Sequence, residues 1–383
     1  MKKTFLFISA QYLPTTGGVE RFTHTLACNL IAQGHRVIVA TSALRDLPNH
    51  ETDANGIEIF RLPAIPFMNG RLPLVRLGRQ FSALSRELWK RKIDYCVINA
   101  YFYPLSMYAA SQVYRRNIPA LIINHGSAWL MTGNQILQLA GQLYEHIASR
   151  LCHHYCPRFF GVSPAARDWV KTFSIIPEGV ITNAIDPDAV KNSADSKTDW
   201  RAELNLPQNT PVIAFVGRMI PEKGVLPLMD AVAVIRQVHP DACLLMAGNG
   251  PLYDQFCNSA PNGVYLLGAQ PYEKVLALLQ QANVFCLPSR SEGFACTVLE
   301  AAAMGCPIIT TATGGSPDLL ITPEYGILLN DMSAESISDA CIQVLSDPQW
   351  QKEAAVRSYQ RLVENFTWNS SLQQLCDAFH LQK

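Results

Sequence analysis

Short apolar runs alternate with longer stretches of helical periodicity along this chain, and no other feature restricts its fold as strongly. The run Val212-Ile213-Ala214-Phe215-Val216 is typical, because near-continuous hydrophobicity indicates a strand covered on both faces. Strands of this kind, each followed by a helix, predict an α/β fold with two doubly wound, Rossmann-like parallel sheets. We expect strands at 4–9, 36–41, 57–62, 93–99, 120–124 and 159–162, and then at 212–217, 242–247, 264–268, 284–288, 307–310 and 326–329.

The 383 residues of the chain exceed the usual size of one domain, about 150 residues, more than twofold. We expect one Rossmann-like domain over 1–180 and a second over 181–366, with a hinge inside 176–198, where prolines and polar residues gather. Doubly wound sheets bind ligands outside the carboxyl ends of their strands. Two such domains facing each other predict a ligand-binding cleft between them.

Composition and charge exclude several classes of protein. With 49% hydrophobic and 16% charged residues the chain is not disordered, and 31 basic against 31 acidic residues lack the positive excess of a dedicated nucleic-acid binder. The longest apolar run, 301–309, is too short for a spanning helix of about 20 residues. The apolar start, 5–10, breaks at Gln11 and is predicted as a buried strand rather than a signal peptide. Eleven cysteines, several inside apolar runs, indicate a reducing cytoplasm.

Two glutamates mark the first candidate site. Glu292 lies in the loop after an expected strand, and Glu300 lies two turns into a helix expected from about Thr297 to Met304. Eight positions apart, both side chains can face one pocket, where the amides at the start of the helix bind an anion. The pair also fits a surface glutamate and an ordinary glutamate on a helix face.

Two cations mark a second candidate site, in the loop 217–224 after another expected strand. Arg218 can contact phosphate oxygens in bidentate fashion, and Lys223 adds a point charge, so together they can neutralise a departing diphosphate. A solvated pair of cations at a helix start is the alternative.

These motifs together resemble the retaining glycosyltransferases of family 4, which have the two-domain GT-B fold. The resemblance covers nearly the whole chain. Its further motifs are Gly17-Gly18-Val19-Glu20, Gly161-Val162-Ser163, Asn183-Ala184-Ile185-Asp186 and Phe366-Thr367-Trp368.

The resemblance implies a role for each of the four charged residues. Glu292 would bind hydroxyls of the donor sugar, Glu300 the ribose of the nucleotide, and Arg218 and Lys223 the diphosphate. The donor-binding residues implied in the loop and helix after 288 are Glu292, Gly293, Phe294, Ala295, Cys296, Thr297, Val298 and Glu300.

From the first half, the resemblance implies donor contacts by Gly17, Gly18 and His125. The two glycines would let the backbone approach phosphate closely. His125, after the expected strand 120–124, would lie beside the donor sugar, although a lone histidine is usually structural. The catalytic residues implied are His125, Arg218, Lys223 and Glu292.

The function implied is retaining transfer of a hexose-type sugar from a nucleotide diphosphate, UDP rather than GDP, to a hydroxyl acceptor that is a lipid-linked or cell-envelope glycan. The first domain would bind the acceptor, with a C-terminal helix over 367–383 packing back on it, and the second the donor. No cofactor and no metal are implied. A dinucleotide-dependent oxidoreductase is one alternative, but the first loop lacks Gly-x-Gly-x-x-Gly. A non-catalytic nucleotide-sugar-binding protein is the other.

Two patterns suggest metal ligands. Asp186-Pro187-Asp188 is an Asp-x-Asp, but it lies in the expected hinge and not after a core strand. Cys152-His153-His154-Tyr155-Cys156 contains four potential zinc ligands, but no second cluster follows at finger-like spacing. For both patterns we expect a role that does not involve a metal ion.

The segment 71–92 has seven basic residues and one acidic residue, a net charge of +6, so the rest of the neutral chain carries −6. Leu77, Phe81, Leu84 and Leu88 form an apolar stripe at helical spacing. One interpretation is an interfacial helix on an anionic membrane, on the inner face of the cell membrane, which would suit a polyprenyl-linked acceptor. The other is a solvated face over a core stripe.

Overall fold

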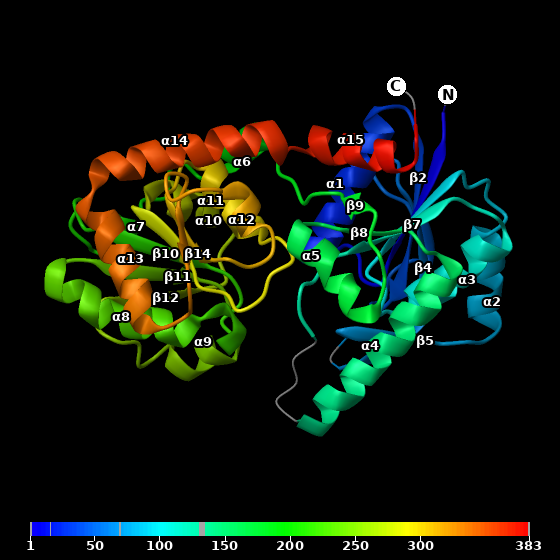
Figure 1. The fold of residues 1–383 in the computed structure, drawn as a ribbon, viewed down its shortest axis with the longest axis horizontal. Coiled ribbons are helices and arrows are strands. Elements are labelled where there is room, and N and C mark those ends of the chain that lie inside the picture. The colour runs from blue at the N-terminus through cyan, green and yellow to red at the C-terminus, as the bar shows by residue number, and fades with distance from the viewer. Residues whose placement is uncertain (1, 16, 69, 130–134, 382–383) are drawn as a thin grey trace. The chain divides into compact units, whose positions relative to one another are not determined.

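The computed structural model describes residues 2–15, 17–68, 70–129 and 135–381. The chain forms two compact units, and each is described by itself (Figure 1). Unit 1 comprises Met1–Asn183 and Trp368–Lys383, and unit 2 comprises Ala184–Thr367. Unit 1 is therefore discontinuous in sequence, while unit 2 is one continuous segment.

Unit 1 is built on a sheet with the strand order β3-β4-β2-β1-β6-β7-β8-β9, in which β5 pairs with β4 outside this path. The strands are parallel except β3 and β5, which run antiparallel to β4. The central strand β1 is fully buried and pairs with both β2 and β6. The strands are β1 (Thr4–Ser9), β2 (Arg36–Ala43), β3 (His50–Thr52), β4 (Glu58–Phe67), β5 (Leu72–Val75), β6 (Tyr95–Asn99), β7 (Ala120–Asn124), β8 (Phe159–Gly161) and β9 (Gly179–Val180).

Helices cover this sheet, and the last of them comes from the end of the chain. In α15, Gln374 Oε1 accepts a hydrogen bond of 2.7 Å from the Thr182 amide, and the Trp368 ring lies 5.9 Å from that of Phe22 in α1. Helix α15 thus packs on the N-terminal unit. The helices of unit 1 are α1 (Gly18–Ala32), α2 (Arg79–Leu88), α3 (Pro104–Arg115), α4 (Gln135–Tyr155), α5 (Pro164–Trp169), η1 (Val170–Phe173) and α15 (Trp368–Ala378).

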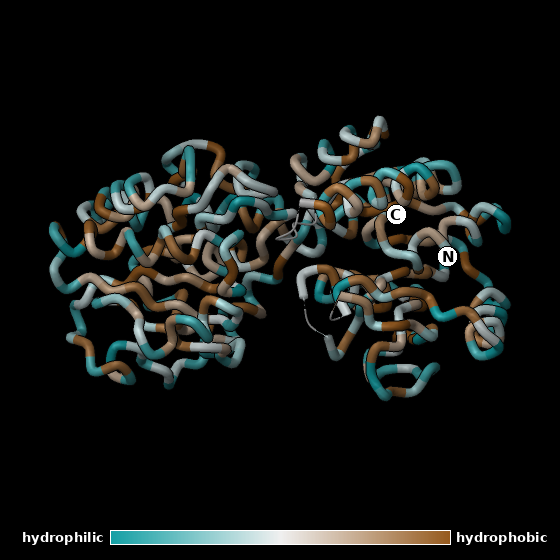
Figure 2. Tube along the Cα trace, turned by 90° about the horizontal axis from the view of Figure 1, so that it is seen from below, coloured by the Kyte–Doolittle hydropathy of each residue, from teal (hydrophilic) through white to brown (hydrophobic). Residues whose placement is uncertain are grey.

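Unit 2 contains a six-stranded parallel sheet with the order β12-β11-β10-β13-β14-β15. Strand β10 lies between β11 and β13, so the order reverses direction beside β10. In Figure 2 apolar strands run through the middle of this unit and polar segments surround them. The strands are β10 (Val212–Val216), β11 (Cys243–Ala247), β12 (Val264–Gly268), β13 (Val284–Leu287), β14 (Ile308–Thr311) and β15 (Ile327–Leu329).

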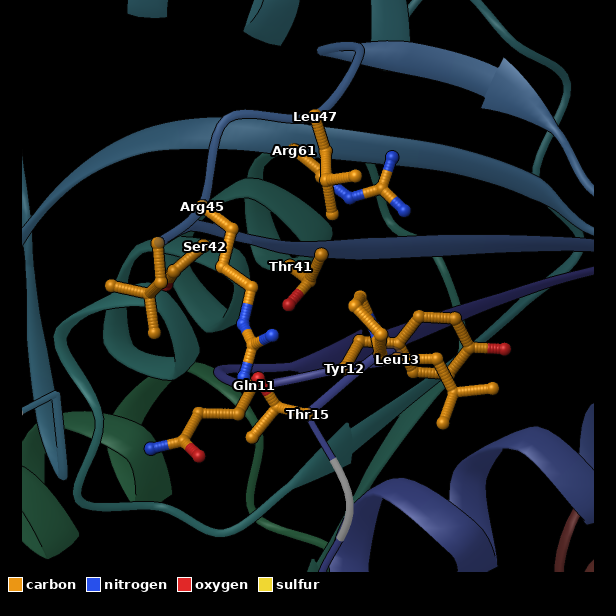
Figure 3. Close-up of a pocket in the computed structure, with 11 residues that line it drawn as sticks. Gln11, Tyr12, Leu13, Thr15, Thr41, Ser42, Arg45, Leu47 and Arg61 are labelled. Carbon is orange, nitrogen blue, oxygen red and sulfur yellow. The ribbon is translucent and has the colours of Figure 1, made fainter.

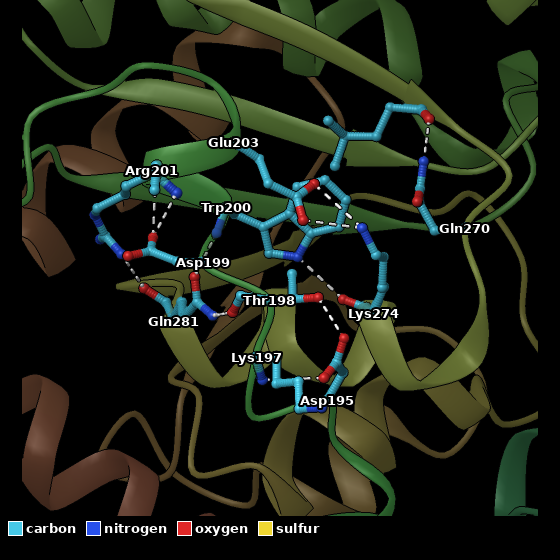
Figure 4. Close-up of polar contacts among 12 residues, drawn as sticks. Asp195, Lys197, Thr198, Asp199, Trp200, Arg201, Glu203, Gln270, Lys274 and Gln281 are labelled. Carbon is cyan, nitrogen blue, oxygen red and sulfur yellow. Dashed lines mark hydrogen bonds and ion pairs between the residues drawn. The ribbon is translucent and has the colours of Figure 1, made fainter.

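The segment that enters unit 2 is fastened by a polar network around α7 (Figure 4). The Trp200 amide donates to Gln281 Oε1 at 3.0 Å, Arg201 donates to the carbonyl of Thr210, and Asp199 caps the helix. The helices of unit 2 are α6 (Pro187–Ser193), α7 (Trp200–Glu203), η2 (Pro221–Lys223), α8 (Val225–Val238), α9 (Pro251–Phe256), α10 (Tyr272–Gln281), α11 (Cys296–Ala303), α12 (Ser316–Leu319), α13 (Ala334–Ser346) and α14 (Pro348–Asn365).

The α/β fold with two doubly wound sheets is confirmed, and each of the twelve expected strands is present within a few residues of its expected bounds. The single helix suggested by the stripe within 71–92 is wrong in two respects. Part of the segment is strand β5, and Leu77 lies outside α2. Phe81 and Leu88 are buried and Leu84 packs against the core, whereas Leu77 is 77% exposed, so the part of the stripe that lies in α2 faces the protein.

Helix α4 differs from α2, because large aliphatic side chains lie on its solvent-exposed face. Its buried face includes Ala148 and Cys152. The exposed residues are Ile136 (76%), Leu139 (66%), Leu143 (63%), Ile147 (52%) and Leu151 (43%). Among the helices of the described ranges, none combines the length and the apolar composition needed to cross a bilayer.

Candidate functional site

The candidate site of unit 2 lies at the carboxyl ends of β10 and β13, where the strand order reverses. Ligands of doubly wound sheets bind at this position. The two loops are joined, because the Arg290 amide donates a 2.8 Å hydrogen bond to the carbonyl of Glu222. Gly224 has φ +68°, and a Cβ there would collide with the Pro288 carbonyl oxygen. The loops therefore need glycine at 224 to come this close.

Lys223 and Glu292 form an ion pair across these two loops. Lys223 Nζ contacts Glu292 Oε1, and Ser289 Oγ donates to the same oxygen at 2.6 Å. Both charged side chains are largely buried, with 19% and 10% exposure, and Ser289 is fully buried. Charge-assisted hydrogen bonds of this kind hold a carboxylate in one orientation. The structure thus brings together two residues from the two candidate sites, and it adds Ser289, which sequence reasoning missed.

Arg218 lies two residues after Val216, the last residue of β10, and its side chain is exposed. Within the described ranges the structure records no ion pair for its guanidinium. Its backbone is fixed on both sides, because the Met219 amide donates to the Asn249 carbonyl at 2.9 Å and a Cβ at Gly248 would collide with the Gly217 carbonyl oxygen. Arg218 thus presents an exposed charge from a loop whose backbone is hydrogen-bonded to a neighbouring loop.

Two glycines after β14 support the loop that carries Glu292. Gly314 has φ +59°, and a Cβ there would lie 2.6 Å from the Gly293 carbonyl oxygen, while a Cβ at Gly315 would collide with the Phe294 ring. Sequence reasoning gave these glycines no role. The signal that could have found them is a Gly-Gly pair directly after a strand, which often marks a close approach of backbone.

Helix α11 starts at Cys296, one residue before the expected start. Phe294 and Ala295 are buried, whereas Cys296 and Thr297 are half-buried at the first turn, where backbone amides point out of a helix. Glu300 lies two turns further and is only 3% exposed. An ionised carboxylate at this depth requires polar partners.

At the start of α1, a carboxylate occupies the position where the resemblance implies phosphate. Gly17 is the N-cap of α1 in extended conformation, and the Glu20 carboxylate folds back so closely that a Cβ at Gly17 would collide with Glu20 Oε2. Gly18 has open space around its Cα. Glu20 is 8% exposed, and burial raises its pKa.

His125 follows β7 and is half-buried. Its Nε2 lies 2.8 Å from Asn99 Oδ1, and its ring packs against that of Phe22 in a T-shaped arrangement with 5.1 Å between the ring centroids. Burial lowers the pKa of His125 to about 3. The imidazole is therefore neutral at physiological pH, and it is not a general acid there.

A small cavity lies at the carboxyl ends of β1 and β2 (Figure 3). Its volume of about 10 Å³ admits one water molecule and no sugar. Thr41 Oγ1 lines it and is buried without a hydrogen-bond partner within the described ranges.

The two metal-like patterns have structural roles. Asp186 Oδ1 caps helix α6 by accepting hydrogen bonds from the amides of Asp188 and Ala189. Cys152 and Cys156 are buried in the core of unit 1. In the part of the chain that the structure describes, no group of three or more His, Cys, Asp or Glu side chains is arranged to hold a metal ion.

Two doubly wound units, one of which carries a buried lysine–glutamate pair where its strand order reverses, define an α/β protein with a candidate ligand site at that switch point. The comparisons specify the family. Residues 196–363 match the model of the glycosyl transferases group 1, and residues 16–189 match that of Glycosyltransferase Family 4. The chain belongs to these family 4-type glycosyltransferases, has the GT-B fold, and is a hexosyltransferase.

Relatives resemble the chain over nearly all its length. The GDP-mannose-dependent monoacylated alpha-(1-6)-phosphatidylinositol monomannoside mannosyltransferase of Corynebacterium glutamicum is 25% identical, over 90% of this chain and 89% of that protein. Sucrose-phosphate synthase from Thermosynechococcus elongatus has the same fold, with a TM-score of 0.77 and 21% identity over 99% of this chain and 98% of that one. The structure of Anabaena HepE in complex with UDP-glucose has a TM-score of 0.75 and 18% identity, over 99% of this chain and 100% of that one.

Proposed function

We propose that the chain transfers a hexose from a UDP-sugar to a hydroxyl acceptor with retention of configuration. The observation that carries this proposal is the buried Lys223–Glu292 pair at the switch point of unit 2, with Arg218 on the same loop. The structures of Anabaena HepE with UDP and with UDP-glucose support UDP as the nucleotide of the donor. The relative named for GDP-mannose makes GDP the competing choice.

In this proposal the protein stabilises charge that develops as the anomeric C–O bond breaks. Negative charge grows on the leaving diphosphate, and Arg218, Lys223 and the amides at the start of α11 stabilise it by preorganised electrostatics. Glu292, held by Lys223 and Ser289, faces the sugar, on which positive charge grows. No carboxylate is assigned as a nucleophile. The acceptor attacks on the face that the diphosphate leaves, and the leaving phosphate takes the acceptor's proton.

Unit 2 binds the donor in this proposal, with Gly293, Phe294, Ala295, Cys296, Thr297, Val298 and Glu300 around it. Unit 1 binds the acceptor, a lipid-linked or cell-envelope glycan, and supplies Gly17, Gly18 and His125 to the donor. The eleven cysteines, all free in the structure, support a reducing cytoplasm as its compartment.

A ligand screen by thermal unfolding tests the proposal. We expect UDP-glucose or another UDP-hexose to raise Tm, because a ligand that binds only the folded state stabilises it, and a slow release of UDP to accompany binding. NADH and NADPH serve as controls for the oxidoreductase alternative. Stabilisation by GDP-mannose alone would show that the donor nucleotide is GDP and not UDP. Stabilisation without UDP release would favour the non-catalytic alternative. Stabilisation by NADH or NADPH alone would overturn the proposal.

We further propose that unit 1 binds an anionic membrane through the exposed face of α4. The residues 71–155 include ten basic and three acidic residues, a net charge of +7 in a chain of net charge zero. One of the three acids, Glu145, is buried and accepts a hydrogen bond from Tyr101. Exposed aliphatic side chains on a helix, in a segment with a positive net charge, support binding of that helix at an anionic lipid interface.

Replacing Leu143 and Ile147 together by glutamine should lower the affinity for phosphatidylglycerol vesicles roughly tenfold, because two apolar side chains no longer enter the interface. Sedimentation with vesicles measures this. The matched control is glutamine at Val234 and Val238, which are similarly exposed on α8 of unit 2. Equal loss in both double variants, or no binding by the unmodified protein, would contradict the proposal.

A further inference from the structure

A chain of hydrogen bonds in unit 1 runs from the backbone of α1 to His125. Thr23 Oγ1 lies 2.7 Å from the carbonyl oxygen of Val19. Asn99 Nδ2 lies 2.9 Å from Thr23 Oγ1, and Asn99 Oδ1 lies 2.8 Å from His125 Nε2. Thr23 and Asn99 are fully buried, so water does not compete for these groups.

The chemistry of each group determines which atom donates and which accepts in this series of hydrogen bonds. A carbonyl oxygen can only accept, so the Thr23 hydroxyl gives its single proton to Val19. Toward Asn99 the hydroxyl can then only accept, which places the amide nitrogen of Asn99 beside Thr23 and the amide oxygen beside His125. That oxygen can only accept as well. The proton between them therefore belongs to His125 Nε2.

We infer that this chain holds His125 in the neutral tautomer protonated on Nε2, so that Nδ1 offers a lone pair to a substrate hydroxyl and Thr23 and Asn99 are positioning residues. The inference rests on the proposed function only for the hydroxyl, which we assign to the donor sugar. Within the described ranges the hydrogen bond recorded for the His125 ring is the one at Nε2.

Two further observations agree with a fixed, neutral ring. The imidazole packs against Phe22 of α1 in a T-shaped arrangement, and Phe22 in turn packs against Trp368 of α15. Burial also lowers the pKa of His125. A ring held in this way acts as an acceptor that selects a hydroxyl, and it does not exchange protons with the substrate.

Nitrogen NMR of the full chain, labelled with ¹⁵N-histidine, tests the tautomer directly. The nine histidines are separated by comparison with His125→Gln, which removes one pair of signals. At pH 7 we expect the Nδ1 signal far downfield, as an unprotonated ring nitrogen, and Nε2 bonded to a proton. Adding UDP-glucose or GDP-mannose should move the Nδ1 signal, and adding UDP or GDP alone should not.

A pair of variants at Thr23 tests the positioning role. Thr23→Val keeps the shape but removes the hydroxyl, so the Asn99 amide can turn over and both tautomers become populated. We expect kcat/KM to fall about three- to tenfold, as for the loss of one hydrogen bond, with nucleoside diphosphate affinity unchanged. Thr23→Ser keeps the hydroxyl and should retain the Nδ1 signal and the rate. Thr25→Val, two residues along α1, controls for an added valine.

The outcomes separate this inference from the proposed function. A proton on Nδ1 in the unmodified protein, or an Nδ1 signal and a rate equal in Thr23→Val and Thr23→Ser, overturns the inference even if the enzyme transfers sugar. A sugar-induced shift of Nδ1 without any transfer supports the inference and removes the proposed activity. Thermal unfolding of the variants shows whether a change in rate reflects loss of fold.

Discussion

Replacing Lys223 by alanine lowers kcat/KM for the true donor by about 10²-fold or more, which is the largest effect that we expect at this site. Lys223 supplies a charge to the leaving diphosphate, and it also holds Glu292 through their ion pair. The variant loses both, in a position where each side chain is largely buried and charge-assisted contacts are strong. Initial rates over a range of donor concentrations measure the loss.

Arg218→Ala should lower kcat/KM to a similar extent, about 10²-fold, but through the diphosphate alone, because Arg218 makes no contact with Glu292 within the described ranges. Lys352→Ala is the matched control, because Lys352 is an exposed cation on α14 of the same unit. If Lys223→Ala and Arg218→Ala both kept more than half of the unmodified rate, neither residue would bind the leaving group.

Replacing each of the two glutamates by glutamine should have different effects on nucleotide binding and on turnover. Glu300→Gln should weaken the binding of nucleoside diphosphate, the product without sugar, by about tenfold, because a charged hydrogen bond contributes roughly 1.5–3 kcal/mol. Glu292→Gln should leave that affinity intact or raise it slightly, because Lys223 loses its internal partner and becomes available to phosphate. Turnover of Glu292→Gln should fall by about ten- to a hundredfold, since its contact is to the sugar.

Titration calorimetry with UDP and GDP, together with steady-state kinetics, distinguishes these two effects. Glu300 is nearly fully buried, so thermal unfolding must show that its variant is folded. The division of labour between the two glutamates fails if both variants bind the diphosphate equally weakly, or if neither affects binding or rate.

The buried strands could be predicted from the sequence, but the short strands at the edges of the sheet could not. Strands such as β1 and β7 are covered on both faces, and their continuous hydrophobicity identifies them. Strand β3 consists of His50, Glu51 and Thr52, which lack any apolar pattern, and β9 has only two residues. Hydrogen bonding to a neighbouring strand, and not composition, makes these segments strands.

For the site, residue types could be predicted from the sequence, but contacts could not. Lys223 and Glu292 are far apart in the chain and meet because β13 pairs with β10, and strand order is a property of the whole sheet. The stripe on α2 and the exposed face of α4 show the same limit. Helical periodicity finds an apolar face but does not tell whether protein or solvent lies against it.

The discontinuity of unit 1 has a consequence for synthesis on the ribosome. Helix α15 emerges only after all of unit 2 has been made, and until then Phe5 and Tyr95 lack the Phe379 ring that packs on both of them. Unit 2 is continuous and has no such dependence. Although domains generally fold in the order in which they are made, here the domain begun first is completed last, so the nascent chain exposes part of its N-terminal core for the time needed to translate the whole second domain.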